Sequence, residues 1–119
     1  MGTFAFTQLD VWKKSHELAL DTYRITEGFP RKEAFRLTHQ ACAAAASVPA
    51  NICEGYGRRH ARDKIRFYNF SEGSLQELRY YFILARDLGY VADLRKVFEL
   101  ICDVESMLRR LIASIGRGL

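Results

Sequence analysis

Residues 37–53 read LTHQACAAAASVPANIC, and this stretch decides the fold because none of its 17 residues is Asp, Glu, Lys or Arg. It is rich in alanine, the residue with the highest intrinsic helix propensity. We predict a helix from about residue 31 to residue 57. We expect a kink at Pro49, because proline lacks a backbone donor and its ring clashes with the carbonyl of Ala45.

Helical periodicity continues on both sides of this stretch. Apolar side chains recur every three or four residues over about residues 7–27, 63–88 and 92–115. Glycine follows or closes each of the four segments, as is typical where helices end. No segment shows the strict alternation of a half-buried strand. The sequence therefore predicts an all-α fold with a single domain over residues 1–119, an up-down-up-down antiparallel four-helix bundle.

The same periodicity defines lines of side chains along three of the helices, and Thr7 is the expected N-cap of the first helix. On the first helix the line is Leu9, Trp12, His16, Ala19, Leu20 and Tyr23. On the third helix it is Phe67, Phe70, Ser74, Leu78, Tyr81, Ala85 and Leu88. The fourth helix is expected to bury Leu94, Val97, Ile101, Leu108, Ile112 and Ile115.

The outer side of the second helix lacks the charges that a solvated helix face normally carries. Small or apolar residues cover nearly every direction around it, and residues 80–84 do the same on the third helix. Large exposed apolar surfaces mark interaction sites, so we predict a homo-oligomer. The predicted interface residues are Ala43, Ala46, Ala50, Tyr80, Phe82 and Ile83. The alternative is that alanines are tolerated on a solvated face, where they expose little apolar area.

A line of polar residues follows one side of the second helix. At 100° per residue, a narrow sector holds Gln40, Ser47, Asn51, Glu54 and Arg58. Such a line fixes helix register, caps the carbonyl freed by the proline, or binds a ligand. We favour a structural role, because buried polar networks more often specify packing.

The strongest charge feature is the turn between the second and third helices. It carries five cations, Arg58, Arg59, Arg62, Lys64 and Arg66, and one acid, Asp63. We predict that these cations contact the phosphates of RNA or DNA. The alternative is a solvated turn whose cations complement the negative C-terminal end of the second helix.

No constellation of residues indicates catalysis, a metal site or a cofactor. His39 and Cys42 lack the further ligands that zinc needs, and Glu54 and Glu77 lack the Glu-x-x-His pattern of di-iron bundles. Cys42, Cys53 and Cys102 are expected to be buried free thiols. Without a signal peptide or an apolar run long enough to span a membrane, the protein is expected to be cytoplasmic. Its formal charge of +4 permits an anionic partner without requiring one.

Two motifs stand out, S-x-P-x-N-x-x-E-G over residues 47–55 and G-S-x-x-E-L over residues 73–78. With LDVWK at 9–13 and LGY at 88–90, the chain resembles the four-helix bundle proteins encoded within intervening sequences of 23S rRNA genes. The resemblance implies an up-down-up-down bundle assembled as a ring-shaped homopentamer. It also implies nucleic-acid binding, because a related accessory protein of diversity-generating retroelements partners a reverse transcriptase and RNA.

One difference from that family concerns the second helix. Family members often carry two arginines shortly after the glutamine, whereas Gln40 is followed by Ala41, Cys42 and Ala43. The leading prediction is a non-enzymatic, homo-oligomeric scaffold that binds nucleic acid through the basic turn repeated in each subunit. The alternative is a protein-interaction module or accessory subunit without nucleic-acid contact.

Overall fold

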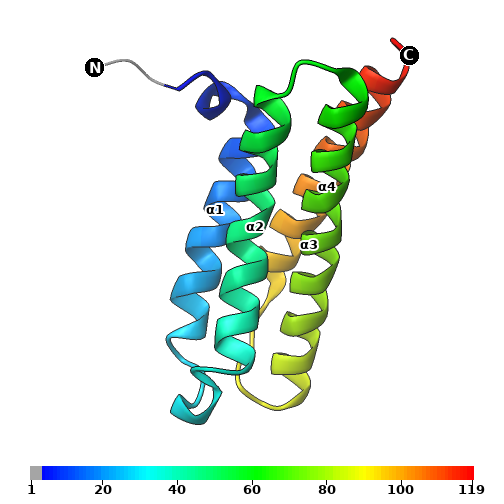
Figure 1. The fold of residues 1–119 in the computed structure, drawn as a ribbon. Helices are drawn as coiled ribbons and strands as arrows, with labels where there is room; N and C mark the ends of the chain where they lie inside the picture. The colour runs from blue at the N-terminus through cyan, green and yellow to red at the C-terminus, as the bar shows by residue number, and fades with distance from the viewer. Residues whose placement is uncertain (1–3) are drawn as a thin grey trace.

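The computed structural model describes residues 4–119; residues 1–3 of the predicted domain lie outside this range. The four long helices are α1 (Asp10–Thr26), α2 (Leu37–Gly57), α3 (Ala61–Asp87) and α4 (Arg95–Gly116). They run alternately up and down, and each packs against its neighbours in the chain, while α4 also packs against α1 (Figure 1). The residues that the structure describes form no strand. The predicted all-α, up-down-up-down bundle is confirmed.

Two short 3-10 turns, η1 (Ala5–Gln8) and η2 (Arg31–Glu33), precede α1 and α2. They correct two predicted helix starts. Thr7 does not cap α1; its hydroxyl donates to the carbonyl of Phe4 at 2.6 Å within η1. The second helix begins at Leu37 rather than near residue 31, and the buried carboxylate of Glu33 accepts the Leu37 N–H at 3.4 Å.

The α2 helix is helical on both sides of Pro49, as predicted. Side chains supply extra donors to carbonyls in the turn before the proline. Asn51 Nδ2 donates to the carbonyl of Ser47 at 2.9 Å, and Ser71 Oγ of α3 donates to that of Val48 at 2.8 Å. The predicted line of polar residues therefore supplies a donor to the carbonyl of Ser47, whereas the carbonyl that the proline was expected to free is that of Ala45.

The core lies between all four helices. It includes Ala19, Leu78 and Ala85 of the predicted lines of α1 and α3, but most of its residues on these two helices lie beside those lines. On α4 the predicted residues Leu94, Val97, Ile101 and Leu108 are buried. Tyr23 of α1 is 52% exposed and Phe70 of α3 is 49% exposed, although both belong to the predicted lines. In α1 the buried residues are Val11, Ser15, Leu18, Ala19, Thr22 and Thr26. In α3 they are Tyr68, Ser71, Leu75, Leu78, Phe82 and Ala85. Adjacent residues are rotated by about 100° around a helix axis, so two apolar lines can lie side by side. On α1 and α3 the line that is mostly buried is not the more aromatic one.

Two glycines have identifiable structural reasons. Gly89 follows α3 with φ of 79°, and the N–H of Tyr90 donates to the carbonyl of Ala85 at 2.9 Å, so the predicted helix stop is confirmed. Gly55 lies inside α2 against the buried ring of Tyr68. A Cβ at Gly55 would lie 2.6 Å from Tyr68 Cε1, so only glycine allows α2 and α3 to approach this closely.

Candidate nucleic-acid interface

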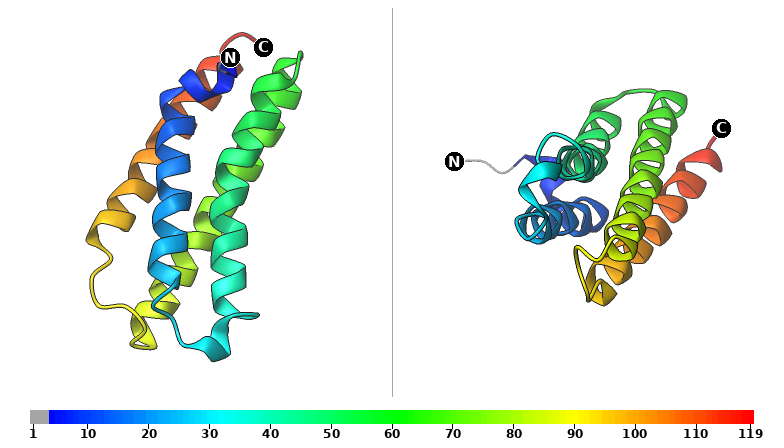
Figure 2. Two further views of the ribbon diagram at one scale, coloured as in Figure 1. Left: turned by 90° about the vertical axis from the view of Figure 1, so that its left-hand side faces the viewer. Right: turned by 90° about the horizontal axis from the view of Figure 1, so that it is seen from below.

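The turn between α2 and α3 contains only residues 58–60 and lies at the same end of the bundle as both chain termini (Figures 1 and 2). Arg58 pairs with Glu54 of α2 at 3.3 Å, and Arg66 pairs with Asp63 of α3 at 3.7 Å. Both guanidinium groups also lie over the ring of Phe67, with Cζ 4.5 and 4.9 Å from its centroid. The aromatic ring therefore gathers two of the predicted cations at one place.

The other three cations of the turn differ in their contacts. Arg59 and Arg62 are exposed and form no ion pair within residues 4–119. Lys64 is half-buried, and its Nζ donates to the carbonyls of Tyr56 at 2.8 Å and Gly55 at 3.3 Å. These are carbonyls of the last turn of α2, which carries the negative end of the helix dipole. Lys64 therefore fits the alternative prediction, in which a cation stabilises the negative C-terminal end of α2.

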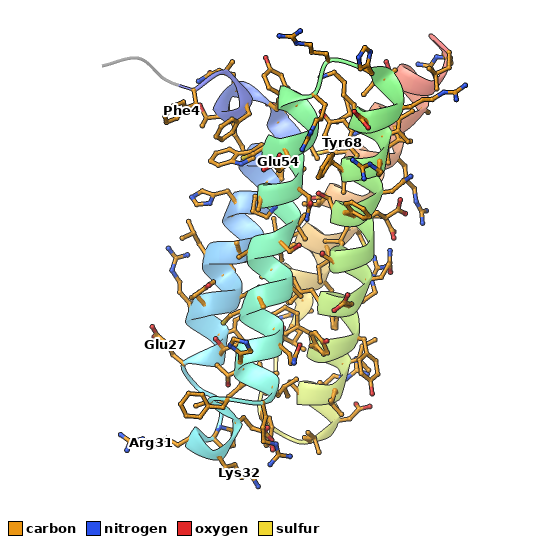
Figure 3. All side chains as sticks on the ribbon, viewed as in Figure 1. Phe4, Glu27, Arg31, Lys32, Glu54 and Tyr68 are labelled. Carbon is orange, nitrogen blue, oxygen red and sulfur yellow. The ribbon has the colours of Figure 1, made fainter. Side chains whose placement is uncertain are left out.

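The fold also gathers basic residues that are distant in the sequence. Residues 4–14, 51–70 and 108–119 lie at the end of the bundle that carries the turn (Figure 1). These three segments contain ten Lys or Arg and three Asp or Glu, whereas residues 15–50 and 71–107 contain eight Lys or Arg and eleven Asp or Glu. Two of those eleven acids, Glu72 and Glu105, lie next to the basic end and pair with Arg109. Figure 3 labels residues at both ends, Glu54 and Tyr68 at the basic one and Arg31 and Lys32 at the other. One end of the molecule is thus strongly basic although the whole chain is only mildly so.

The predicted interface residues are only partly on the surface. Ala43, Ala50 and Tyr80 are exposed, and Ala46 and Ile83 are half-buried. Phe82 is fully buried in the core of the four-helix bundle, so its assignment to the interface is corrected. The reason is again geometric, because Phe82 belongs to the inward line of α3 and Tyr80 lies about 200° away from it around the axis.

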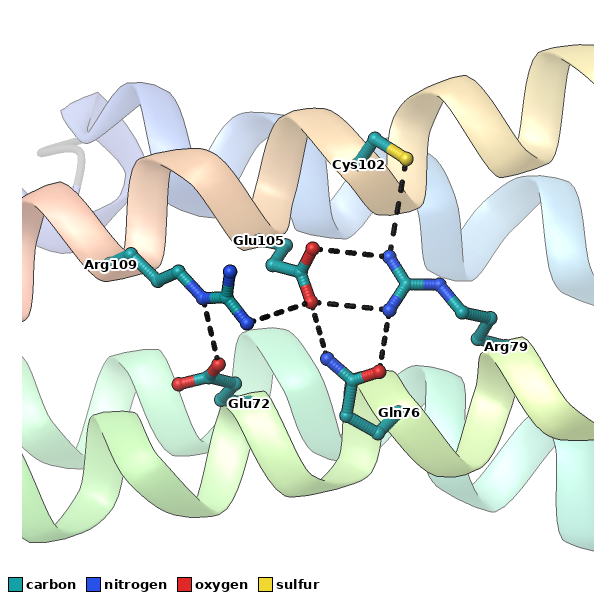
Figure 4. Close-up of polar contacts among 6 residues, drawn as sticks. All are labelled: Glu72, Gln76, Arg79, Cys102, Glu105 and Arg109. Atoms are coloured by element: carbon teal, nitrogen blue, oxygen red, sulfur yellow. Dashed lines mark hydrogen bonds and ion pairs between the residues drawn. The ribbon is translucent and has the colours of Figure 1, made fainter.

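Sequence reasoning missed a polar network between α3 and α4 (Figure 4). Arg79 of α3 pairs with Glu105 of α4 at 3.1 Å, and Arg109 of α4 pairs with Glu72 of α3 at 3.1 Å. The bonds from Arg79, supported by Gln76, hold the pKa of Glu105 below its ordinary value. No spacing rule finds partners 26 and 37 residues apart, so only the packed structure reveals the network.

Other sequence predictions concern thiols, metals and membranes. Cys42 and Cys53 are half-buried free thiols, but Cys102 is exposed beside Arg79, which corrects the expectation that all three are buried. Within residues 4–119 no three His, Cys, Asp or Glu side chains are grouped as metal ligands would be. None of the helices in this range is long and apolar enough to cross a membrane.

Residues 7–112 match a family described as 23S rRNA-intervening sequence protein. The chain belongs to this family. Its fold is also similar to the crystal structure of a protein of unknown function from the S23 ribosomal protein family of Bacteroides thetaiotaomicron. The TM-score is 0.77 at 20% sequence identity, and the match covers 86% of this chain and 97% of that one. No curated protein sequence matches the chain.

In this member of the 23S rRNA-intervening sequence protein family, the two sequence motifs meet in space. Ser74 Oγ of the second motif donates to Ser47 Oγ of the first at 2.8 Å, and Asn51 Nδ2 donates to the same hydroxyl at 2.9 Å. Glu54 pairs with Arg58, while Gln40 lies near the opposite end of α2 and is exposed. The middle of the predicted polar line thus joins α2 to α3, which supports a structural role for Ser47 and Asn51.

Proposed function

We propose that this protein is a non-enzymatic, self-associating scaffold that binds RNA or DNA through the phosphates. The observation that carries the proposal is the basic end of the bundle, where ten Lys or Arg stand against three Asp or Glu. Arg59 and Arg62 are the available cations of the α2–α3 turn, because they are exposed and form no ion pair among the described residues. The pairs of Arg58 and Arg66 are at the surface, where such pairs are weak enough to exchange for phosphate.

Self-association belongs to the same proposal, and the family resemblance suggests a pentamer. The outer side of α2 exposes Ala43 and Ala50, and Tyr80 of α3 is 57% exposed. Residues 37–53 contain no charged side chain that would favour exposure of this surface to water. A ring of copies would repeat the basic end in every subunit, and several weak phosphate contacts would then act together.

Salt-dependent binding tests the nucleic-acid part. The affinity for a labelled RNA or DNA should fall steeply with salt, because each phosphate contact releases counterions. Changing Arg59 and Arg62 together to alanine should weaken binding and reduce the slope of log affinity against log salt by about two, roughly one per contact. The matched control is Arg31→Ala with Lys32→Ala, two exposed cations at the opposite end (Figure 3). Absence of any binding at low salt would refute the proposal.

Light scattering tests self-association. The purified protein should have a mass that is a multiple of 13.7 kDa, five times that value for the pentamer. Changing Ala43 and Ala50 to glutamate should lower the mass, because charges would enter the contact surface, while leaving the helix content unchanged. A wild-type mass of one chain would contradict this part of the proposal.

A protein-interaction module is the second candidate, and a different feature favours it. Phe35 is 93% exposed at the end opposite the basic one. It lines a groove together with the apolar or aromatic residues Leu37, Tyr81, Leu84 and Leu88 and the polar residues Glu33, Arg36 and Gln40. An exposed aromatic in a groove that mixes apolar and polar side chains is typical of protein contacts. Recovery of one protein partner after nuclease treatment, lost in Phe35→Ala but retained when Arg59 and Arg62 are alanine, would favour this function over the first.

A further inference from the structure

Two aromatic rings of α3, Phe67 and Phe70, lie next to cations of the α2–α3 turn and of the first turns of α3. Phe70 is 49% exposed and packs edge-on against Phe67, with ring centroids 5.6 Å apart and planes at 89°. The ring of Phe67 in turn lies beneath the guanidinium groups of Arg58 and Arg66. Phe70 thus presents a half-exposed ring next to the Phe67 ring that carries two of the cations, at the inner edge of the basic end of the bundle.

Packing within the subunit does not explain this ring. The buried core of α3 is formed by Tyr68, Ser71 and Leu75, and Phe70 lies on the outward line. Exposure of a phenylalanine ring to water is unfavourable, because the ring is apolar and has no polar atom for a hydrogen bond. Besides apolar and cation–π contacts, the ring can stack on another flat ring, and base–aromatic stacking accepts any nucleobase because every base has a π-face.

We infer that Phe70, held by Phe67 and the two guanidinium groups over it, is the stacking platform for an unpaired nucleobase. The ligand class is therefore single-stranded nucleic acid or an unpaired loop, with the phosphates on Arg59 and Arg62. A duplex offers the same phosphates, but its base faces are already stacked on one another. This inference rests on the proposed nucleic-acid function and narrows its ligand.

The charge around Phe70 favours a nucleic acid over a second copy of the chain as the occupant. A two-fold contact through this surface would bring Arg58, Arg59 and Arg62 against the same residues of the other copy. Such like charges repel, whereas a polyanion neutralises them. A head-to-tail contact, as in the proposed ring, would instead bury Phe70 against a different surface, and the mass of Phe70→Ala tests for it. The cations and the ring together match a ligand that carries phosphates and flat bases on one strand.

The test compares three labelled oligonucleotides of one length: a single strand, the matching duplex, and a single strand with abasic sites. Anisotropy titrations use the full chain with Phe70→Ala, Phe70→Tyr, and Tyr23→Ala as a control. Tyr23 is an equally exposed aromatic (52%) on α1. Phe70→Ala should weaken binding of the intact single strand by about tenfold, within the range expected for one stacked base. Phe70→Tyr should restore it, and Tyr23→Ala should have no effect.

The duplex and the abasic strand distinguish base stacking on Phe70 from phosphate contacts with the arginines. Phe70→Ala should leave the affinities for the duplex and the abasic strand unchanged, because neither offers a free base face, whereas alanine at Arg59 and Arg62 should weaken all three. Equal loss on all strands, or no loss on the intact single strand, would overturn the inference and leave the proposed function in place. A lower mass of Phe70→Ala in light scattering would also overturn it, because a second copy would then cover the ring. If the wild type binds no strand at low salt, the proposed function itself fails.

Discussion

The two sides of α3 contact their neighbours in different ways. Toward α2, Ser71 donates to the carbonyl of Val48 and Ser74 to Ser47, both at 2.8 Å, and Tyr68 fills the space over Gly55. Toward α4, the surface contacts are ion pairs, with Arg79 and Glu105 exposing 26% and 18% of their side chains (Figure 4). The first side depends on small residues and neutral hydrogen bonds, and the second on partly exposed charges.

This difference should decide how each side responds to mutation and to solvent. A closely packed contact responds to the addition of a single methyl group, because the interior has no free volume to receive it. An ion pair near the surface is partly screened by water and salt, so its loss changes the free energy of unfolding only slightly. The α2–α3 contact should therefore be more sensitive to substitution, and the α3–α4 contact more sensitive to pH and salt.

The largest effect is expected from Gly55→Ala. The new Cβ would lie 2.6 Å from the ring of Tyr68, which is 2% exposed and has little room to move. Overpacking of this kind lowers the free energy of unfolding by about 1 to 3 kcal/mol. Thermal or denaturant unfolding measures the change.

Gly73→Ala is the matched control, because this glycine is also inside a helix but a Cβ there meets nothing within 4 Å. It should stabilise the protein by about 0.5 to 1 kcal/mol through helix propensity. If the two alanines had the same effect, the close approach at Gly55 would not explain the requirement for glycine.

An intermediate effect is expected from Ser74→Ala. It removes a donor to Ser47, and a typical hydrogen bond contributes about 0.5 to 1.5 kcal/mol to the free energy of unfolding. The double variant with Ser47→Ala should lose less than the sum of the single variants, because the two hydroxyls share one bond. Ser106→Ala, at an exposed position of α4, is the control. Strict additivity in the double-mutant cycle would mean that the motifs are not energetically coupled.

The smallest effect is expected from Glu105→Gln, below about 1 kcal/mol at neutral pH. The pKa of Glu105 is lowered in the folded protein, mainly by Arg79, so its charged form stabilises the fold above the ordinary glutamate pKa of 4.5. That stabilisation is lost as the pH falls through the lowered pKa.

The stability difference between wild type and Glu105→Gln should therefore shrink on acidification, and it should also shrink in high salt. Glu99→Gln, on the same helix and without an ion pair among the described residues, is the control. A difference that stayed constant from neutral to acidic pH would contradict the ionic description of this contact.

Much of the fold was predictable from the sequence because helices follow local rules. Apolar spacing located four helices, and Gly57 and Gly89 were correctly placed at their ends. The inward face of α3 was not predictable in the same way, because Phe67 and Phe70 form an apolar line beside that of Tyr68 and Ser71. Periodicity shows that a helix has apolar lines, but the neighbouring helices decide which line is buried.

The candidate site shows the same division. The cluster of cations at the turn was visible in the sequence, because it is a local run of residues. The capping role of Lys64 and the position of two guanidinium groups over Phe67 were not visible, since they depend on how the chain turns between α2 and α3.

By itself the sequence determined four helices, their approximate ends and a basic turn, since each depends on residues within a few positions of one another. The tertiary structure decided that three distant basic segments share one end, that Ser47 meets Ser74, and that Phe70 remains exposed. The physical reason is that these features arise only when antiparallel helices pack in register. Packing brings together residues that no local pattern connects.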